Sequence, residues 1–155
     1  MSQPKVVMIG LGYIGLPTAA LIAQSKTYVH GVDINPLVVD TINAGKIHII
    51  EPELDSAVAN AVKEGFLKAS TTPVEASTYL IVVPTPFKAK NEPDISFVEA
   101  ATKAIIPLLK EDDLYIIEST SPVGTTEKMM SLIYQERPDL KDKLNIAYCP
   151  ERVLP

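Results

Sequence analysis

Short apolar runs alternate with longer amphipathic segments along the whole chain. The run at residues 6–9, Val-Val-Met-Ile, is uninterrupted and rich in β-branched side chains, which is typical of a strand buried on both faces. Tyr79 to Val83 is the clearest run of this kind after the first, and the prolines that follow it would end a strand there. The same pattern predicts further strands at 28–32, 67–70, 114–118 and 145–148.

Between these runs the apolar positions follow a helical period. Asn35-Pro36 is a typical helix start, since asparagine caps the first amides and proline fits the first turn. Gly45 and Gly65 each follow a periodic segment, where glycine commonly ends a helix. The predicted helices cover residues 13–25, 36–44, 53–64, 96–109 and 124–135, and 88–94 is expected to be a polar loop.

Strands that alternate with helices predict an α/β fold with a parallel sheet and helices on both faces. The doubly wound (Rossmann) arrangement is the expected form, because crossovers between parallel strands are nearly always right-handed. We find no internal repeat and no linker, so residues 1–155 are interpreted as one domain. Because the chain stops close behind a predicted strand, we expect a truncated protein.

Composition narrows the function classes. The net charge is −5 and no basic run is present, which argues against nucleic acid as a partner. No apolar run approaches the roughly 18 residues of a membrane span, and His30 and His48 lack metal-ligand spacing. The single cysteine, Cys149, is interpreted as a buried structural thiol, and a cytoplasmic location is the default expectation.

A glycine-rich turn follows the first predicted strand. Gly10, Gly12 and Gly15 match the dinucleotide-binding pattern, in which they make the turn, admit a pyrophosphate and allow close helix packing. Asp33 ends the second strand 18 positions after Gly15, where a carboxylate binds the adenosine ribose and repels the extra phosphate of NADP. The pattern therefore predicts an NAD site, although a strand-end aspartate can also simply cap a turn.

Three further candidates lie at the same sheet edge. Thr85 stands between two prolines and is placed either to touch a cofactor or to form a rigid turn. The segment 118–126 brings hydroxyl groups to the edge, as a cleft wall or as an ordinary capped loop. Glu151 follows the last strand and is either a catalytic carboxylate or an exposed side chain.

Taken together, these segments resemble the UDP-glucose/GDP-mannose dehydrogenase family over the whole chain. The final segment is similar to the UDP-N-acetyl-D-mannosamine dehydrogenase branch in particular, since the glucose branch has Phe-Leu after the glutamate and an acidic residue in place of Pro155. The segments that carry the resemblance are 10–20, 32–35, 83–86, 119–126 and 149–155.

The resemblance implies oxidation of a sugar C6 alcohol to a carboxylate in two NAD-dependent steps, through a cysteine thiohemiacetal and thioester. It implies that Thr120 positions water and that Glu151 assists the hydrolysis. Arg152 and Val153 would contact the nucleotide sugar. The residues expected to line the NAD site are Gly10, Gly12, Tyr13, Ile14, Gly15, Asp33, Thr85 and Thr126.

The family's nucleophilic cysteine, with its lysine and asparagine, is expected beyond residue 155, and Cys149 matches a different position. The central helix, homodimer interface and UDP-sugar-binding domain are likewise expected outside this chain. We therefore expect residues 1–155 to be capable of binding NAD and incapable of turnover alone. The alternatives are a UDP-glucose or GDP-mannose 6-dehydrogenase, a non-catalytic NAD-sensing module, and a dehydrogenase of small hydroxy acids.

Overall fold

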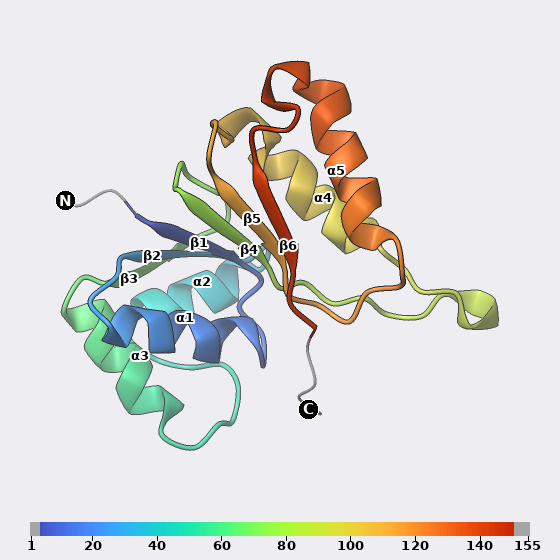
Figure 1. The fold of residues 1–155 in the computed structure, drawn as a ribbon. Coiled ribbons are helices and arrows are strands. Elements are labelled where there is room, and N and C mark those ends of the chain that lie inside the picture. Colours follow the sequence, from blue (N-terminus) through green and yellow to red (C-terminus); the bar gives the residue numbers. More distant parts are fainter. Residues whose placement is uncertain (1–3, 151–155) are drawn as a thin grey trace.

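A computed structural model describes residues 4–150, which form one six-stranded sheet with helices on both faces (Figure 1). The strands are β1 (Val6–Ile9), β2 (Val29–Val32), β3 (Leu67–Ser70), β4 (Thr78–Ile81), β5 (Leu114–Ile117) and β6 (Asn145–Tyr148). The α-helices are α1 (Gly15–Gln24), α2 (Pro36–Asn43), α3 (Leu54–Lys63), α4 (Ser96–Ile105) and α5 (Thr125–Glu136). Short 3₁₀ turns are η1 (Ala89–Asn91), η2 (Ile106–Leu108) and η3 (Pro138–Leu140).

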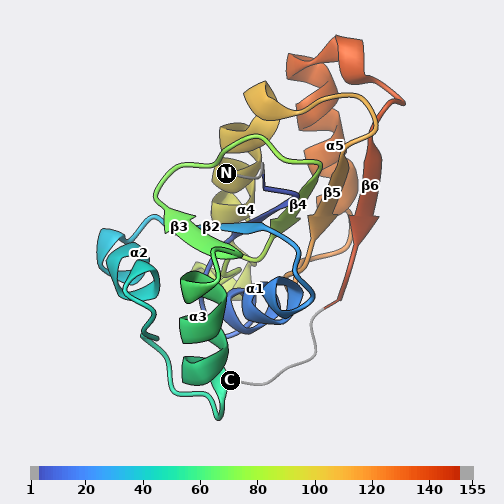
Figure 2. The same cartoon turned by 90° about the vertical axis from the view of Figure 1, so that its left-hand side faces the viewer.

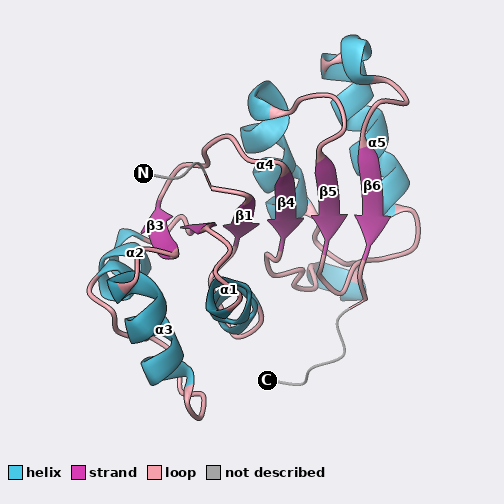
Figure 3. Cartoon of the chain, turned by 60° about the vertical axis from the view of Figure 1, so that its left-hand side comes forward, coloured by secondary structure: helices cyan, strands magenta, loops and turns pink. Residues whose placement is uncertain are grey.

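The strand order is β3-β2-β1-β4-β5-β6, and every neighbouring pair is parallel. Figure 3 shows β4, β5 and β6 side by side with their arrowheads at one edge. From β1 the chain adds β2 and β3 on one side, and it then crosses back to place β4, β5 and β6 on the other side of β1. In doubly wound folds ligands bind at this switch point, beyond the carboxyl ends of the strands. The predicted α/β doubly wound fold is confirmed.

The sheet separates two apolar cores. On one face Met8 and Leu80 pack with side chains from α1, α2 and α3. On the other face Val7, Tyr79 and Ile117 pack with side chains from α4 and α5. Figure 2 shows α1 and α3 side by side on one side of the sheet, with α4 and α5 on the other. Because successive strand residues point to opposite faces, both cores draw on the same strands, as the continuous apolar runs predicted.

Helix boundaries follow local chemistry. The Asn35 side chain accepts a hydrogen bond from the Leu37 amide at 3.0 Å, which confirms the predicted cap of α2. The predicted helix at 96–109 is shorter than expected, because α4 ends at Ile105 and continues as the 3₁₀ turn η2. Pro107 has no amide hydrogen, so the α-helical hydrogen bonding cannot continue through it.

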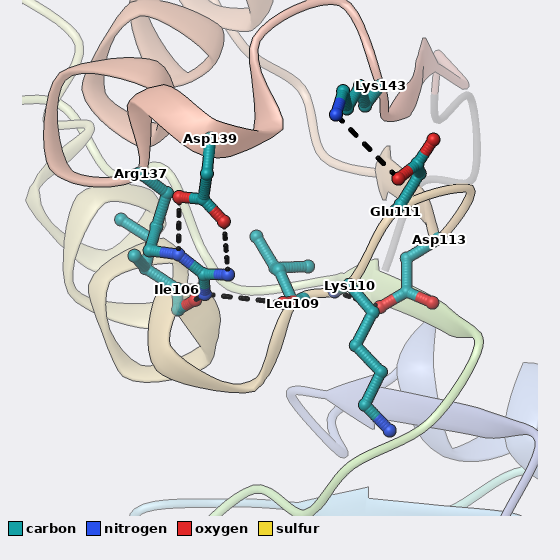
Figure 4. Close-up of polar contacts among 8 residues, drawn as sticks. All are labelled: Ile106, Leu109, Lys110, Glu111, Asp113, Arg137, Asp139 and Lys143. Carbon is teal, nitrogen blue, oxygen red and sulfur yellow. Dashed lines mark hydrogen bonds and ion pairs between the residues drawn. The ribbon is translucent and has the colours of Figure 1, made fainter.

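One arginine joins the ends of α4 and α5 (Figure 4). The Arg137 guanidinium donates to the carbonyls of Ile106 at 3.0 Å and Leu109 at 3.2 Å, and it pairs with Asp139. The Ile106 carbonyl, at the start of η2, also accepts from the Leu109 amide at 3.3 Å, and Leu109 follows the last residue of η2. Arg137 therefore ties the helix layer over β4 and β5 into one unit.

Across residues 4–150, none of the helices combines the length and the apolar character that a membrane span requires.

Candidate functional site

The turn between β1 and α1 is packed so closely that side chains cannot replace two of its glycines. Gly10 has a φ of +101°, and a Cβ there would lie 2.1 Å from the Val82 carbonyl oxygen of the segment after β4. A Cβ at Gly15 would lie 1.8 Å from the carbonyl oxygen of Gly10 itself. The turn thus presses against the neighbouring strand end, and the first residue of α1 presses against the turn. Gly15 serves packing within the loop more directly than the packing of the helix on the sheet.

Gly12 differs from the other two glycines. A Cβ at Gly12 would meet nothing within 4 Å, so the protein's own packing does not require glycine there. Within residues 4–150 the amides of Gly12, Tyr13 and Ile14 donate to no protein acceptor, and they stand at the positive end of α1. Free amides beside an open glycine fit a phosphate ligand, which would occupy the space that a side chain would fill.

Asp33 follows β2 and reaches back to the glycine turn. Its Oδ2 accepts from the Leu11 amide at 3.2 Å, and its Oδ1 accepts from the Asn35 amide at 3.0 Å. The carboxylate therefore does cap a turn, as the alternative interpretation proposed. Each oxygen still has acceptor capacity, and Asp33 also lines the cleft beside Gly12. The two interpretations are compatible, because the capping bonds fix the carboxylate and leave acceptor positions on both of its oxygens.

A cleft of about 540 Å³ opens along the glycine turn and Asp33, and we call it the larger cleft. Its far wall comes from the β3–β4 connection and from α4, which the sequence analysis did not single out. Phe97 is 40% exposed and stands on this wall with three alanines, so an apolar face of this helix was the available signal. The wall residues missed from sequence are Thr71, Pro73, Phe97, Ala100, Ala101 and Ala104.

A second depression of about 400 Å³ adjoins the first, and we call it the smaller hollow. It brings together five residues predicted as site residues from three separate segments: Gly12, Tyr13, Ile14, Thr85 and Thr120. Glu118 and Ser119 complete one side. Thr126, the second residue of α5, does not line either depression, and its contact with NAD stays a prediction.

The loop after β5 is held by hydrogen bonds to its main chain. The Thr85 hydroxyl donates to the carbonyl of Thr120, and the Tyr148 hydroxyl donates to the carbonyl of Ser119 at 3.0 Å. The Ser119 hydroxyl donates to the Ile81 carbonyl at 3.3 Å. The Ser121 hydroxyl oxygen is buried and has no hydrogen-bond partner among the described residues. Buried hydroxyls are normally paired, so the Ser121 hydroxyl is an exception to this rule.

His30 has a structural environment. Its Nε2 lies 2.7 Å from the Ser70 hydroxyl, which in turn donates to the Thr72 carbonyl at 2.6 Å. Burial lowers the pKa of His30, and the positive charge of Lys68 lowers it further. This arrangement anchors the start of the segment that supplies Thr71 and Pro73 to the larger cleft. Residues 4–150 contain no group of histidine, cysteine and acidic side chains that would hold a metal ion.

The prediction that Cys149 is buried is wrong, because its side chain is exposed. It follows β6, which is the edge strand of the sheet, and the residues at that edge are covered on one side only. Three other candidates, Glu151, Arg152 and Val153, lie outside the described residues.

Comparison with known proteins identifies this arrangement. The profile of the UDP-glucose/GDP-mannose dehydrogenase family, NAD binding domain, matches residues 4–155. The chain belongs to the UDP-glucose/GDP-mannose dehydrogenase family. The predicted family and the predicted cofactor, NAD, are confirmed.

Relatives within the family have nucleotide-sugar dehydrogenase names. The UDP-N-acetyl-D-mannosamine dehydrogenase of Escherichia coli (strain K12) is 58% identical over 163 residues, covering 100% of this chain and 39% of that protein. The NDP-N-acetyl-D-galactosaminuronic acid dehydrogenase of Ralstonia nicotianae is 51% identical, covering 97% and 37%. The UDP-N-acetyl-mannosamine dehydrogenase structure from Staphylococcus aureus superposes with a TM-score of 0.90 at 38% identity, covering 97% and 37%. The chain thus spans about two fifths of the length of these relatives.

Proposed function

We propose that residues 1–155 form the NAD-binding domain of a longer nucleotide-sugar 6-dehydrogenase that acts on UDP-N-acetyl-D-mannosamine. The observation that carries the proposal is the convergence at one sheet edge of the Gly12 turn, Asp33 and the Thr120 loop. The 58% identity to the Escherichia coli enzyme over the whole chain supports the substrate. The remaining domains, including the central helix and the UDP-sugar-binding domain, would lie in the rest of the protein.

The proposed reaction converts the C6 alcohol to a carboxylate. One alcohol, two NAD⁺ and one water give one carboxylate, two NADH and three protons, which balances atoms and electrons. NAD, when bound, supplies the hydride acceptor. The chain's own residues divide the remaining tasks: the amides from Gly12 to Ile14 bind phosphate, Asp33 binds ribose, and Thr120 positions water at the smaller hollow.

Residues near the end of the chain are proposed to act on the sugar side. Glu151 would assist water in the hydrolytic step, and Arg152 and Val153 would contact the nucleotide sugar. The segment from Cys149 to Pro155 supports N-acetylmannosamine over glucose, since it lacks the Phe-Leu of the glucose branch. The 51% identity to a galactosaminuronic acid dehydrogenase makes the N-acetylgalactosamine series the first competitor to test. The full-length enzyme is proposed to be a cytoplasmic homodimer without nucleic-acid partners.

The test is a substrate panel with the full-length protein. Absorbance of NADH at 340 nm should rise with UDP-N-acetylmannosamine, to two NADH for each sugar consumed. UDP-glucose, GDP-mannose, UDP-N-acetylgalactosamine and small hydroxy acids are tested in the same assay as alternative substrates. NADH formation with a small acid only, or with none of the compounds, would overturn the proposal.

A variant separates an enzyme from a sensing module. Glu151→Gln in the full-length protein should slow release of the acid product while leaving NAD affinity unchanged. A module without chemistry would show no difference between the variant and the natural sequence in any turnover assay. Product release is followed by chromatography of the uronic acid, and NAD affinity by titration.

A further inference from the structure

Two main-chain carbonyls of the loop that presents Thr120 accept hydrogen bonds from side chains of other segments. Tyr148 donates to the carbonyl of Ser119 at 3.0 Å, and Thr85 donates to the next carbonyl, that of Thr120. Fixing two successive carbonyls orients the peptide planes on both sides of Thr120. The Thr120 side chain is left exposed at the smaller hollow.

Tyr148 is placed to reach across the sheet edge. It is the last residue of β6, where it pairs in register with Ile117 at the end of β5. Its side chain is 43% exposed, so core packing does not account for a tyrosine at this position. An exposed phenol can bond to water at no cost, yet this one is directed to the loop after the neighbouring strand. The hydroxyl is therefore the part of Tyr148 that the structure uses.

Ser119 is itself attached to the sheet. It is 5% exposed, and its own hydroxyl donates to the carbonyl of Ile81 at the end of β4. The Tyr148 bond thus extends a connection that begins on β4, passes through Ser119 and ends on β6. Thr120 is the first residue beyond this connection whose side chain is free to face the hollow.

We infer that Tyr148 is a positioning residue that acts through Thr120, by holding the Ser119 peptide so that the Thr120 hydroxyl stays at the smaller hollow. The inference rests on the proposed function, in which Thr120 positions water near the reacting carbon. Catalytic groups displaced by small distances lose much of their effect, so a bond that only orients a loop can change turnover.

The test is a double-mutant cycle in the full-length protein with Tyr148→Phe and Thr120→Ala. Tyr148→Phe should lower kcat by about three- to tenfold, the range expected from one hydrogen bond, without changing NAD affinity or the melting temperature. In the Thr120→Ala background the same change should have no further effect on kcat. Tyr134→Phe, on α5 and packed against the core, is the matched control and should leave kcat unchanged.

Two outcomes of the cycle would overturn the inference: an unchanged kcat in Tyr148→Phe, or losses that multiply independently in the double variant. Hydrogen exchange of the full-length protein gives a second readout that needs no substrate. Backbone amides of residues 119–121, 123 and 124 should exchange faster in Tyr148→Phe than in Tyr134→Phe, and equal rates would refute the positioning role. A natural protein without turnover would refute the proposed function, and the exchange rates would still decide whether Tyr148 holds the loop.

Discussion

Gly12 and Gly15 are only three positions apart in the chain, yet glycine is needed at each for a different reason. Gly15→Ala places a methyl group 1.8 Å from the Gly10 carbonyl oxygen, so we expect a loss of at least about 2 kcal/mol in the free energy of unfolding. Gly12→Ala meets no protein atom within 4 Å and should change stability by less than about 1 kcal/mol. Thermal unfolding distinguishes the two.

Gly12 is expected to matter for the binding of NAD. Gly12→Ala fills the space beside the free amides and should raise the Kd for NAD about tenfold or more, equivalent to about 1.4 kcal/mol. A titration of folded Gly12→Ala that gave the natural affinity would show that no phosphate approaches this residue.

Asp33 has a structural role through its two hydrogen bonds, and we propose that it also selects the cofactor. Asp33→Asn offers one amide oxygen where two carboxylate oxygens now accept the amides of Leu11 and Asn35, so about 1 kcal/mol of stability should be lost. The variant also removes the charge that repels a 2′-phosphate, so the preference for NAD over NADP should narrow. Kd values for both dinucleotides measure the effect. Asp40→Asn, exposed on α2, is the control and should leave the preference intact.

Among the elements, the junction of α4 and η2 depends on Arg137. Arg137→Met removes charged donors from the carbonyls of Ile106 and Leu109, and we expect a loss of about 1–2 kcal/mol by denaturant unfolding. The partner carboxylate of Asp139 is 62% exposed, and exposed ion pairs contribute little. Asp139→Asn should therefore change stability much less. Equal losses in the two variants would mean that the ion pair, and not the capping of carbonyls, stabilises the junction.

The elements that sequence predicted well are those with a local cause. The apolar run of β1 and the Asn35-Pro36 start of α2 depend on neighbouring residues only, and both are confirmed. Cys149 was misjudged because exposure depends on whether a further strand covers β6, which no local pattern specifies. The wall around Phe97 was missed for a similar reason: the sheet order brings α4 to the glycine turn, and spacing along the chain does not.

For the whole molecule, one buried carboxyl should make stability depend on pH. Asp113 is 6% exposed, and burial raises its pKa, while the amide of Lys110 lowers it by a 2.8 Å hydrogen bond (Figure 4). A raised pKa in the folded state means that ionisation costs more in the folded protein than in the unfolded chain. Stability is thus lost as the pH rises through the folded-state pKa and is retained below the unfolded value near 4.

Asp113→Asn should therefore raise the melting temperature at pH 7, since the amide oxygen can still accept the Lys110 bond without a charge. The gain should shrink as the pH falls through the folded-state pKa and vanish below about 4, where the natural carboxyl is protonated in both states. Melting curves from pH 3 to pH 8 test this, with Asp40→Asn as the exposed control. A gain that is constant with pH would point to packing instead of charge.

The six parallel strands end in register along one edge of the sheet. The residues in one row of the register are Ser70, Val32, Ile9, Ile81, Ile117 and Tyr148. The residues that follow this row begin the binding edge, where Asp33, Gly10, Val82 and Glu118 stand at the ends of successive strands about 4.8 Å apart. Deleting one residue from any strand would move the residue after that strand out of this row and turn the strand's side chains to the opposite face. Strand length, as much as residue identity, therefore determines where the binding residues lie along this edge.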